Sequence, residues 1–73
     1  MTKYVIAVRR ALRGQVGPDW AKPLSTIEGI EIVGDANPYR LRIEATDSAI
    51  ALARRRLGRY CLIEEVEPRY VMG

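Results

Sequence analysis

The sequence predicts an α+β fold, with a four-stranded antiparallel sheet and two helices packed on one of its faces. One observation is the length, because 73 residues are enough for a single small domain. A second is the alternation of apolar residues in four short segments, which indicates strands at residues 3–9, 30–34, 39–45 and 60–66. The third is a helical spacing of apolar residues in two further segments, residues 19–28 and 47–57.

Residues 3–9 are expected to form the first strand, followed by a loop. Tyr4, Ile6 and Val8 alternate with residues that are also apolar in the middle of the segment, a pattern typical of a central strand. Residues 10–17 contain two glycines and show no clean period, which favours a loop.

A short helix is expected at residues 19–28. Asp19 is a good N-cap, and Gly29 is a typical stop signal. Because proline fits only near the first turn of a helix, an alternative is that the helix begins at Pro23. The apolar stripe of this helix consists of Trp20, Leu24 and Ile27.

The middle of the chain is expected to form a hairpin, and a second helix follows it. The segments 30–34 and 39–45 flank a run of turn-forming residues, Gly34 to Pro38. The helix at 47–57 is capped by Thr46 or Asp47, and Gly58 follows it as the stop signal. Its apolar stripe consists of Ala49, Ile50, Ala53 and Leu57, and its last turn carries Arg54, Arg55 and Arg56, which complement the helix dipole.

This order of elements is that of the split βαβ, or ferredoxin-like, arrangement βαββαβ. Right-handed crossovers would place strands 1 and 3 in the centre and both helices on one face. The predicted core comprises Tyr4, Ile6, Val8, Trp20, Leu24, Ile27, Ile30, Ile32, Leu41, Ile43, Ile50, Ala53, Leu57 and Leu62. The other face stays open, with the apolar middle and charged rim of an interface. It is expected to show Val5, Ala7, Glu31, Val33, Arg40, Arg42, Glu44, Cys61 and Ile63.

The composition excludes several classes of site. The chain has no His, and Cys61 is its only cysteine, so an internal disulfide, a structural zinc site and Ser–His or Cys–His catalysis are excluded. We therefore expect neither an enzyme nor a metal or other cofactor. No apolar segment approaches membrane-spanning length, and the N-terminal segment is too short for a signal-peptide core. The expected location is cytoplasmic if the sequence is complete, and secreted if a leader was removed.

The charge distribution leaves a nucleic-acid module open as an alternative function. Lys and Arg outnumber Asp and Glu by 12 to 9, and the excess lies in residues 1–59. This balance suits either a solvated surface or a nucleic-acid partner contacted by Arg40, Arg42 and arginines 54–56. The open faces of strands 1 and 3 carry no aromatic residue for base stacking, which argues against RNA.

The two glycines of the first loop are compatible with another alternative, a regulatory domain that senses a small ligand.

The chain opens with Lys3-Tyr4-Val5-Ile6-Ala7-Val8, a basic residue and a tyrosine followed by an apolar strand. This opening resembles the Lys-Tyr-Ile-Val start of the propeptide domains of subtilisin-like serine proteases. Near the other end, Ala49 to Leu52 and Ala53 to Leu57 match the helix spacing of the family. The segment Ile63-Glu64-Glu65-Val66 stands where the family has a hydrophobic–Glu–Glu–Asp strand. Val66 in place of the acidic residue, and Pro23 in the first helix, depart from the family pattern.

The resemblance implies a freestanding propeptide-like inhibitor of a subtilisin-like protease, a role compatible with that of a folding chaperone. It divides the chain into a domain at residues 1–67 and an extended tail at residues 68–73. The tail would lie in the active-site cleft like a cleaved product, with Met72, or in the alternative register Gly73, in the primary specificity pocket. The residues of the tail that would contact the protease are Arg69, Tyr70, Val71, Met72 and Gly73.

Two further sets of contacts follow from the same resemblance. Carboxylates at the end of the last strand would face the N-termini of two protease helices, where an anion is favoured. The candidates for this role are Glu64, Glu65 and Glu67. The interface on the open sheet would comprise Val5, Ala7, Val33, Arg40, Arg42 and Ile63.

Overall fold

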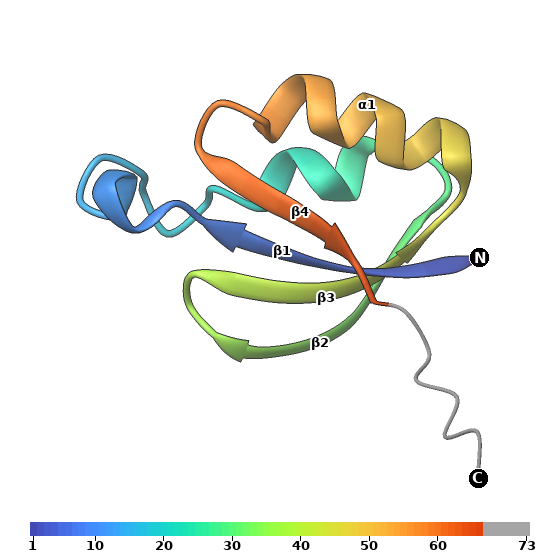
Figure 1. Cartoon of the computed structure of the whole chain (residues 1–73), viewed down its shortest axis with the longest axis horizontal. Helices are drawn as coiled ribbons and strands as arrows, with labels where there is room; N and C mark the ends of the chain where they lie inside the picture. The colour runs from blue at the N-terminus through green and yellow to red at the C-terminus, as the bar shows by residue number, and fades with distance from the viewer. Residues whose placement is uncertain (67–73) are drawn as a thin grey trace, which may run out of the picture.

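The computed structural model describes residues 1–66, with the backbone alone at residues 35 and 36. Its elements are β1 (Thr2–Val8), the 3-10 helices η1 (Arg10–Leu12) and η2 (Lys22–Thr26), β2 (Ile30–Asn37), β3 (Arg40–Ala45), α1 (Asp47–Leu57) and β4 (Cys61–Glu65). The strands form one antiparallel sheet in the order β2-β3-β1-β4, and α1 and η2 lie on the same face of it (Figure 1). The predicted α+β class and four-stranded antiparallel sheet are confirmed.

The first crossover departs from the prediction. Residues 19–28, expected as a short helix, form turns followed by the five-residue 3-10 helix η2. The hydroxyls of Ser25 and Thr26 donate to the carbonyls three residues earlier, each over 2.7 Å. They compete for carbonyl oxygens that an α-helix would use, and Pro23 removes one backbone donor. Among the described residues, α1 is therefore the one α-helix of the fold.

The bounds of α1 agree with those that the sequence predicts. The Thr46 hydroxyl accepts a hydrogen bond from the Ala49 N–H over 3.2 Å, which caps the helix at its start. The Gly58 N–H donates to the Arg54 carbonyl at the other end. The buried face of α1 consists of Ala49, Ile50, Ala53 and Leu57.

The hairpin is longer on its first strand than expected. β2 continues through Asn37, so only Pro38 and Tyr39 turn the chain, and the Asn37 side chain accepts a hydrogen bond from the Tyr39 N–H over 2.9 Å. Its pairing with β3 shifts between Ile32 and Gly34, because Ile32 lies opposite Ile43 while Gly34 lies opposite Arg42. This shift is a β-bulge that accommodates one extra residue.

The core lies between the sheet and the helical layer. It consists of Tyr4, Ile6, Val8, Trp20, Leu24, Ile27, Leu41, Ile43, Ala45, Ala49, Ile50, Ala53, Leu57 and Cys61. Two residues predicted for it are on the surface, since Ile32 is 48% exposed and Leu62 is 45% exposed. η2 has only five residues, and Ile32 on the edge strand β2 remains exposed.

Leu62 is exposed because β4 has the opposite alternation to the one expected. Ile6 lies opposite Ile63 and Val8 opposite Cys61, so Cys61 and Ile63 face the helices rather than the open side. Ile63 is half-buried against the core. The segment 61–63 is apolar at every position, so the sequence pattern cannot distinguish the two faces.

The backbone conformation at Gly29 is one that a side chain strains. Its φ of 95° lies in the left-handed region, and a Cβ there would lie 2.8 Å from the Thr46 hydroxyl oxygen. We expect Gly29→Ala to lower the free energy of unfolding by about 2 kcal/mol or more, because left-handed strain alone costs about 1–2 kcal/mol. Denaturant titration measures this loss in the free energy of unfolding. Gly14→Ala is the matched control, since a Cβ there meets nothing within 4 Å, and a loss of stability at both sites would contradict the assignment.

Cys61 should make stability depend on pH in the alkaline range. Burial raises the pKa of its thiol, and the nearby Arg9 guanidinium partly opposes this shift. Because the pKa is higher in the folded chain, the stabilisation is complete below the unfolded value of about 8.5 and is lost as the pH rises through the folded value. We expect the melting temperature of Cys61→Ala to fall less steeply above about pH 8.5 than that of the parent protein. Parallel slopes in the two melting series would show that this thiol does not contribute.

Candidate functional site

The face of the sheet opposite the helices carries side chains in an ordered array. Antiparallel pairing aligns residues of β3, β1 and β4 in rows across the sheet. Val66 extends the last row beyond β4, because its N–H donates to the Lys3 carbonyl over 2.9 Å. From β3 to β4 the rows are Arg40, Ala7 and Leu62; Arg42, Val5 and Glu64; and Glu44, Lys3 and Val66.

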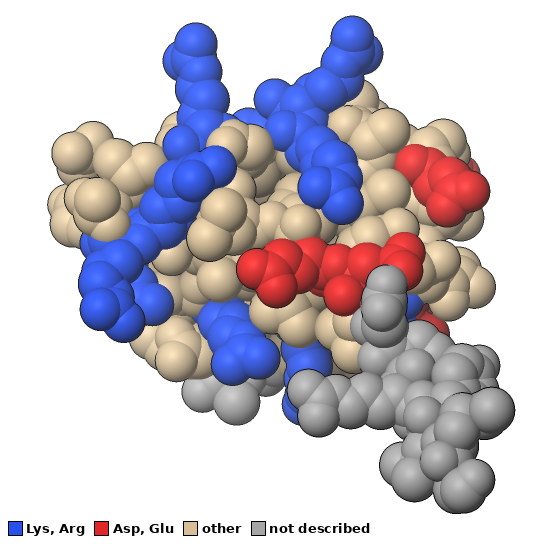
Figure 2. All heavy atoms as spheres, viewed as in Figure 1, with Lys and Arg blue, Asp and Glu red and all other residues tan. Residues whose placement is uncertain are grey.

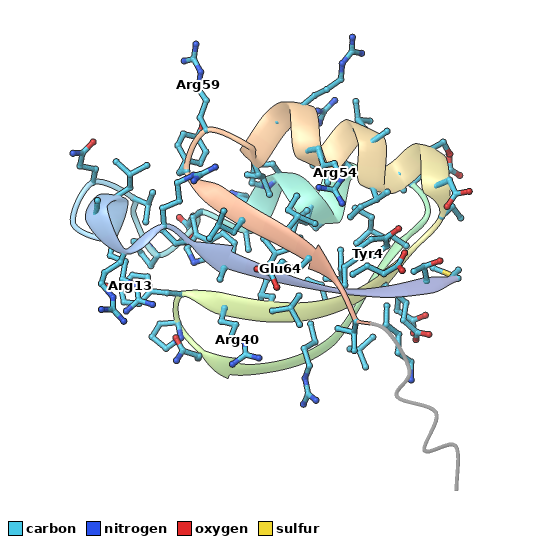
Figure 3. The ribbon with its side chains drawn as sticks, in the orientation of Figure 1. Tyr4, Arg13, Arg40, Arg54, Arg59 and Glu64 are labelled. Carbon is cyan, nitrogen blue, oxygen red and sulfur yellow. The ribbon has the colours of Figure 1, made fainter. Side chains whose placement is uncertain are left out.

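A hollow of about 350 Å³ lies over this array. Val5 and Ala7 are half-buried within it, while Leu62 and Val66 stand 45% and 42% exposed beside them. Arg40 borders the hollow from β3, and Glu64 borders it from β4, on the two sides of β1 (Figure 3). The hollow therefore has apolar walls between a cation and an anion.

At the bulge, β2 adds further exposed surface beside the same face of the sheet. Val33 is 54% exposed and lines a second hollow of about 230 Å³ together with Lys3, Arg42 and Val66. A Cβ at Gly34 would lie only 3.3 Å from the Arg42 guanidinium, so the missing side chain leaves room for Arg42 to lie across β2. The predicted interface residues Val5, Ala7, Val33, Arg40 and Arg42 are thus brought together on or beside this face.

Ile63, predicted for the same interface, lies on the other side of the sheet. It pairs with Ile6 and packs against the core, so its side chain cannot contribute to the open face. Leu62 and Val66 provide the exposed apolar surface on β4 instead. Sequence reasoning missed both, and only the pairing of β4 with β1 identifies them.

The two carboxylates of β4 are separated by the alternation of the strand. Glu64 lies opposite Val5 on the open face, whereas Glu65 lies opposite Tyr4, whose side chain is buried among the helices. Both glutamates are exposed, and β4 is an edge strand. Figure 2 shows carboxylates gathered over β4 and toward the N-terminal end of β1, with basic side chains at the opposite end and above α1.

The predicted tail residues lie outside the part of the chain that the structure describes. These are Glu67, Arg69, Tyr70, Val71, Met72 and Gly73. The last described residue, Val66, is bonded to β1 and lines the larger hollow. The described part of the chain therefore ends at the border of the open face.

The arginines of the nucleic-acid alternative are divided between two faces. Arg40 and Arg42 belong to the open face of β3. On the helical side, Arg54 donates to the Ile63 carbonyl over 3.4 Å, and Arg56 donates to the Thr26 hydroxyl over 3.3 Å. The fold does not assemble these five residues into one phosphate-binding surface.

Comparisons with protein-family models, with curated proteins and with solved structures give no significant match to this chain. In the described part of the chain, the structure contains no helix of the length and apolarity that crossing a membrane requires. The fold and the open face are therefore the basis for the functional proposal.

The two neighbours Leu62 and Ile63 provide a direct check of this geometry. We expect Ile63→Ala to lower the free energy of unfolding by about 1–3 kcal/mol, below the range for fully buried sites because Ile63 is only half-buried. Leu62→Ala should change it by no more than about 0.5 kcal/mol, as at an ordinary surface position. Urea titration of both variants measures the difference. A larger loss for Leu62→Ala would show that β4 pairs in the other register.

Proposed function

We propose that this chain is a propeptide-like inhibitor of a subtilisin-like serine protease, with the open face of the sheet as its contact surface. The observation that carries the proposal is the exposed apolar strip, defined by Leu62 on β4 and Val66 just beyond its end, which flank Glu64 where the described chain ends. Exposed apolar side chains bordered by charges are the anatomy of a protein interface. The strand order and the α1 crossover support a ferredoxin-like form of the fold, with η2 in place of its first helix.

The tail gives this surface a way to reach an active site. An extended segment that continues from β4 can add strand-like hydrogen bonds within a protease cleft, while alternate side chains fill its pockets. A product-like segment inhibits without any catalytic group of its own, which agrees with the absence of His from the chain. Because such an inhibitor binds the folded protease, it also stabilises that state by mass action, the physical basis of a chaperone role.

Glu64 is the carboxylate best placed to assist. It lies on the same face as Val5 and borders the hollow beside Leu62, so a partner that covers the apolar strip also meets this charge. An anion at the N-terminus of a partner helix contributes about 0.3–1 kcal/mol when exposed. Glu65 lies opposite Tyr4 in the alternation of β4 but also borders the hollow, so it is the less directly placed of the two carboxylates.

The proposal is tested by titrating the protein against subtilisin while cleavage of a chromogenic peptide is followed. We expect competitive inhibition, and we expect deletion of residues 70–73 to remove most of it while the melting temperature stays nearly constant. Such a loss is expected because a few pocket-filling side chains dominate the binding energy of most interfaces. If the intact protein does not inhibit, or if the truncated protein inhibits equally well, the product-like mechanism is wrong.

Charge variants separate the open face from the general charge of the molecule. Glu64→Gln should weaken inhibition by about two- to fivefold, more clearly at low salt, because screening reduces exposed charge interactions. Glu28→Gln is the matched control, since Glu28 is also exposed but lies in the turn before β2. Inhibition constants at two salt concentrations measure the effect, and equal changes for both variants would exclude a specific role for Glu64.

A further inference from the structure

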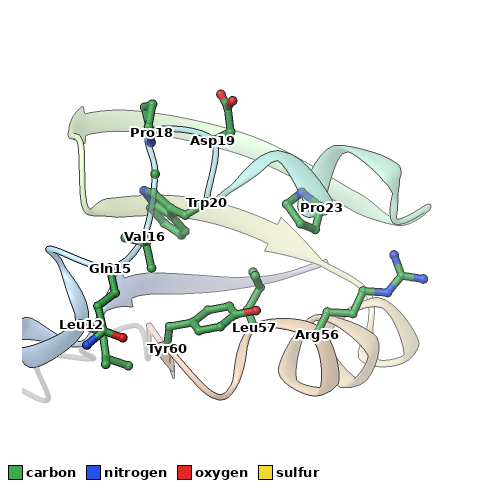
Figure 4. Close-up of a pocket in the computed structure, with 11 residues that line it drawn as sticks. Leu12, Gln15, Val16, Pro18, Asp19, Trp20, Pro23, Arg56, Leu57 and Tyr60 are labelled. Atoms are coloured by element: carbon green, nitrogen blue, oxygen red, sulfur yellow. The ribbon is translucent and has the colours of Figure 1, made fainter.

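A further concave site, separate from the two hollows of the open face, lies on the helical side of the molecule. It is a cavity of about 490 Å³ between the first crossover and the turn from α1 into β4 (Figure 4). This volume is within the range of about 300–1,000 Å³ that small-molecule sites occupy. Its apolar walls are Leu12, Val16, Trp20, Pro23, Leu57 and Tyr60.

These walls offer ring and methyl surface, and Gln15, Asp19 and Arg56 add polar groups to the lining. The indole N–H of Trp20 donates to the Pro38 carbonyl over 2.7 Å, so its polar atom is already bonded within the fold. Leu57 is buried, whereas Tyr60 is 37% exposed and presents its ring beside the cavity. A ligand that fills this space therefore needs an apolar body, and an aromatic one can pack against Tyr60.

One cation and one anion, Arg56 and Asp19, border the cavity, and the end of α1 beside it is rich in arginine. Arg56 lines the cavity, and one guanidinium N–H donates to the Thr26 hydroxyl over 3.3 Å, which holds the group between α1 and η2. A guanidinium has five N–H donors, and a carboxylate can accept two of them in parallel. Residues 54–59 carry four arginines, which outweigh the partial negative charge of the helix C-terminus. Figure 4 shows the charged ends of both Asp19 and Arg56 pointing away from Trp20 and Tyr60, so a ligand would meet these charges at the border and not between the rings.

We propose that this cavity binds a small amphipathic carboxylate, with its apolar body against Trp20 and Tyr60 and its carboxylate on Arg56. The combination of an apolar space of this size with a cation at its border selects for that chemistry over a neutral or cationic molecule of the same shape. The cavity is formed by the helical layer, on the opposite side of the sheet from the proposed protease-contacting face. The proposal therefore does not depend on the protease-inhibitor function.

The full-length protein carries its own reporter for the test, because Trp20 is the only tryptophan and lines the cavity. The probe is 4-phenylbutyrate, and 4-phenylbutylamine is the counter-probe with the same apolar body and the opposite charge. We expect a saturable change of Trp20 emission with the carboxylate, and binding of the amine up to about fivefold weaker, the upper range for one exposed ion pair. Equal affinity for both probes, or no binding of the carboxylate, would overturn the proposal.

Variants show whether the ligand occupies this cavity. Arg56→Gln should weaken 4-phenylbutyrate binding by about two- to fivefold, as for the loss of an exposed ion pair. Arg55→Gln is the matched control, since Arg55 is exposed on the same turn of α1 and does not line the cavity, and it should leave affinity unchanged. Equal weakening by both would indicate a general attraction to the basic surface and overturn the site. In nuclear magnetic resonance spectra, the probe should shift the Trp20 indole N–H signal. Shifts confined to Val5 and Leu62 on the open face would also overturn it.

Discussion

The pairing of β1 with β4 is held at both ends by backbone hydrogen bonds. The Arg9 N–H donates to the Tyr60 carbonyl over 2.7 Å, and the Val66 N–H donates to the Lys3 carbonyl over 2.9 Å. Since a shift of one residue would move every side chain of a strand to the other face, these bonds decide what the molecule presents to a partner. In the observed register the open side receives Leu62, Glu64 and Val66, and the core receives Cys61 and Ile63.

The short first crossover shapes the rest of the molecule. Trp20 is buried and its indole bonds to the Pro38 carbonyl, so the crossover is tied to the β2–β3 turn across the end of the sheet. A full helix here would cover more of β2 and fill the space beside Tyr60. Because η2 has only five residues, Ile32 stays exposed and a cavity remains between the crossover and α1.

The charge pattern separates two surfaces of a small molecule. The open face combines an exposed apolar strip with a cation on β3 and an anion on β4, whereas the helical side carries the arginines of α1 around an apolar cavity. A domain of this size buries only about 60% of its unfolded surface, so apolar side chains that remain outside can serve binding. The two surfaces lie on opposite sides of the sheet, which allows two different ligands to bind without competing for the same residues.

The sequence by itself determined the elements whose periodicity is unambiguous. The helix at Asp47–Leu57 has caps and one apolar stripe, and the strand at Arg40–Ala45 alternates cleanly between apolar and charged residues, so their existence and buried faces follow from local pattern alone. The predicted open-face positions Val5, Ala7, Arg40 and Arg42 follow from the same alternation.

Only the tertiary structure decided the faces and lengths that local pattern leaves open. The run Cys61-Leu62-Ile63 is apolar in either alternation, so its orientation came from pairing with β1. The extension of β2 through Asn37 required a bulge and a side-chain-bonded turn, although its residues favour a loop. The hydroxyls of Ser25 and Thr26 bond to the backbone of the first crossover, and the Trp20 indole bonds the same segment to a turn far along the chain. Periodicity does not report contacts between residues distant in sequence, and these contacts placed the exposed apolar strip and the second cavity.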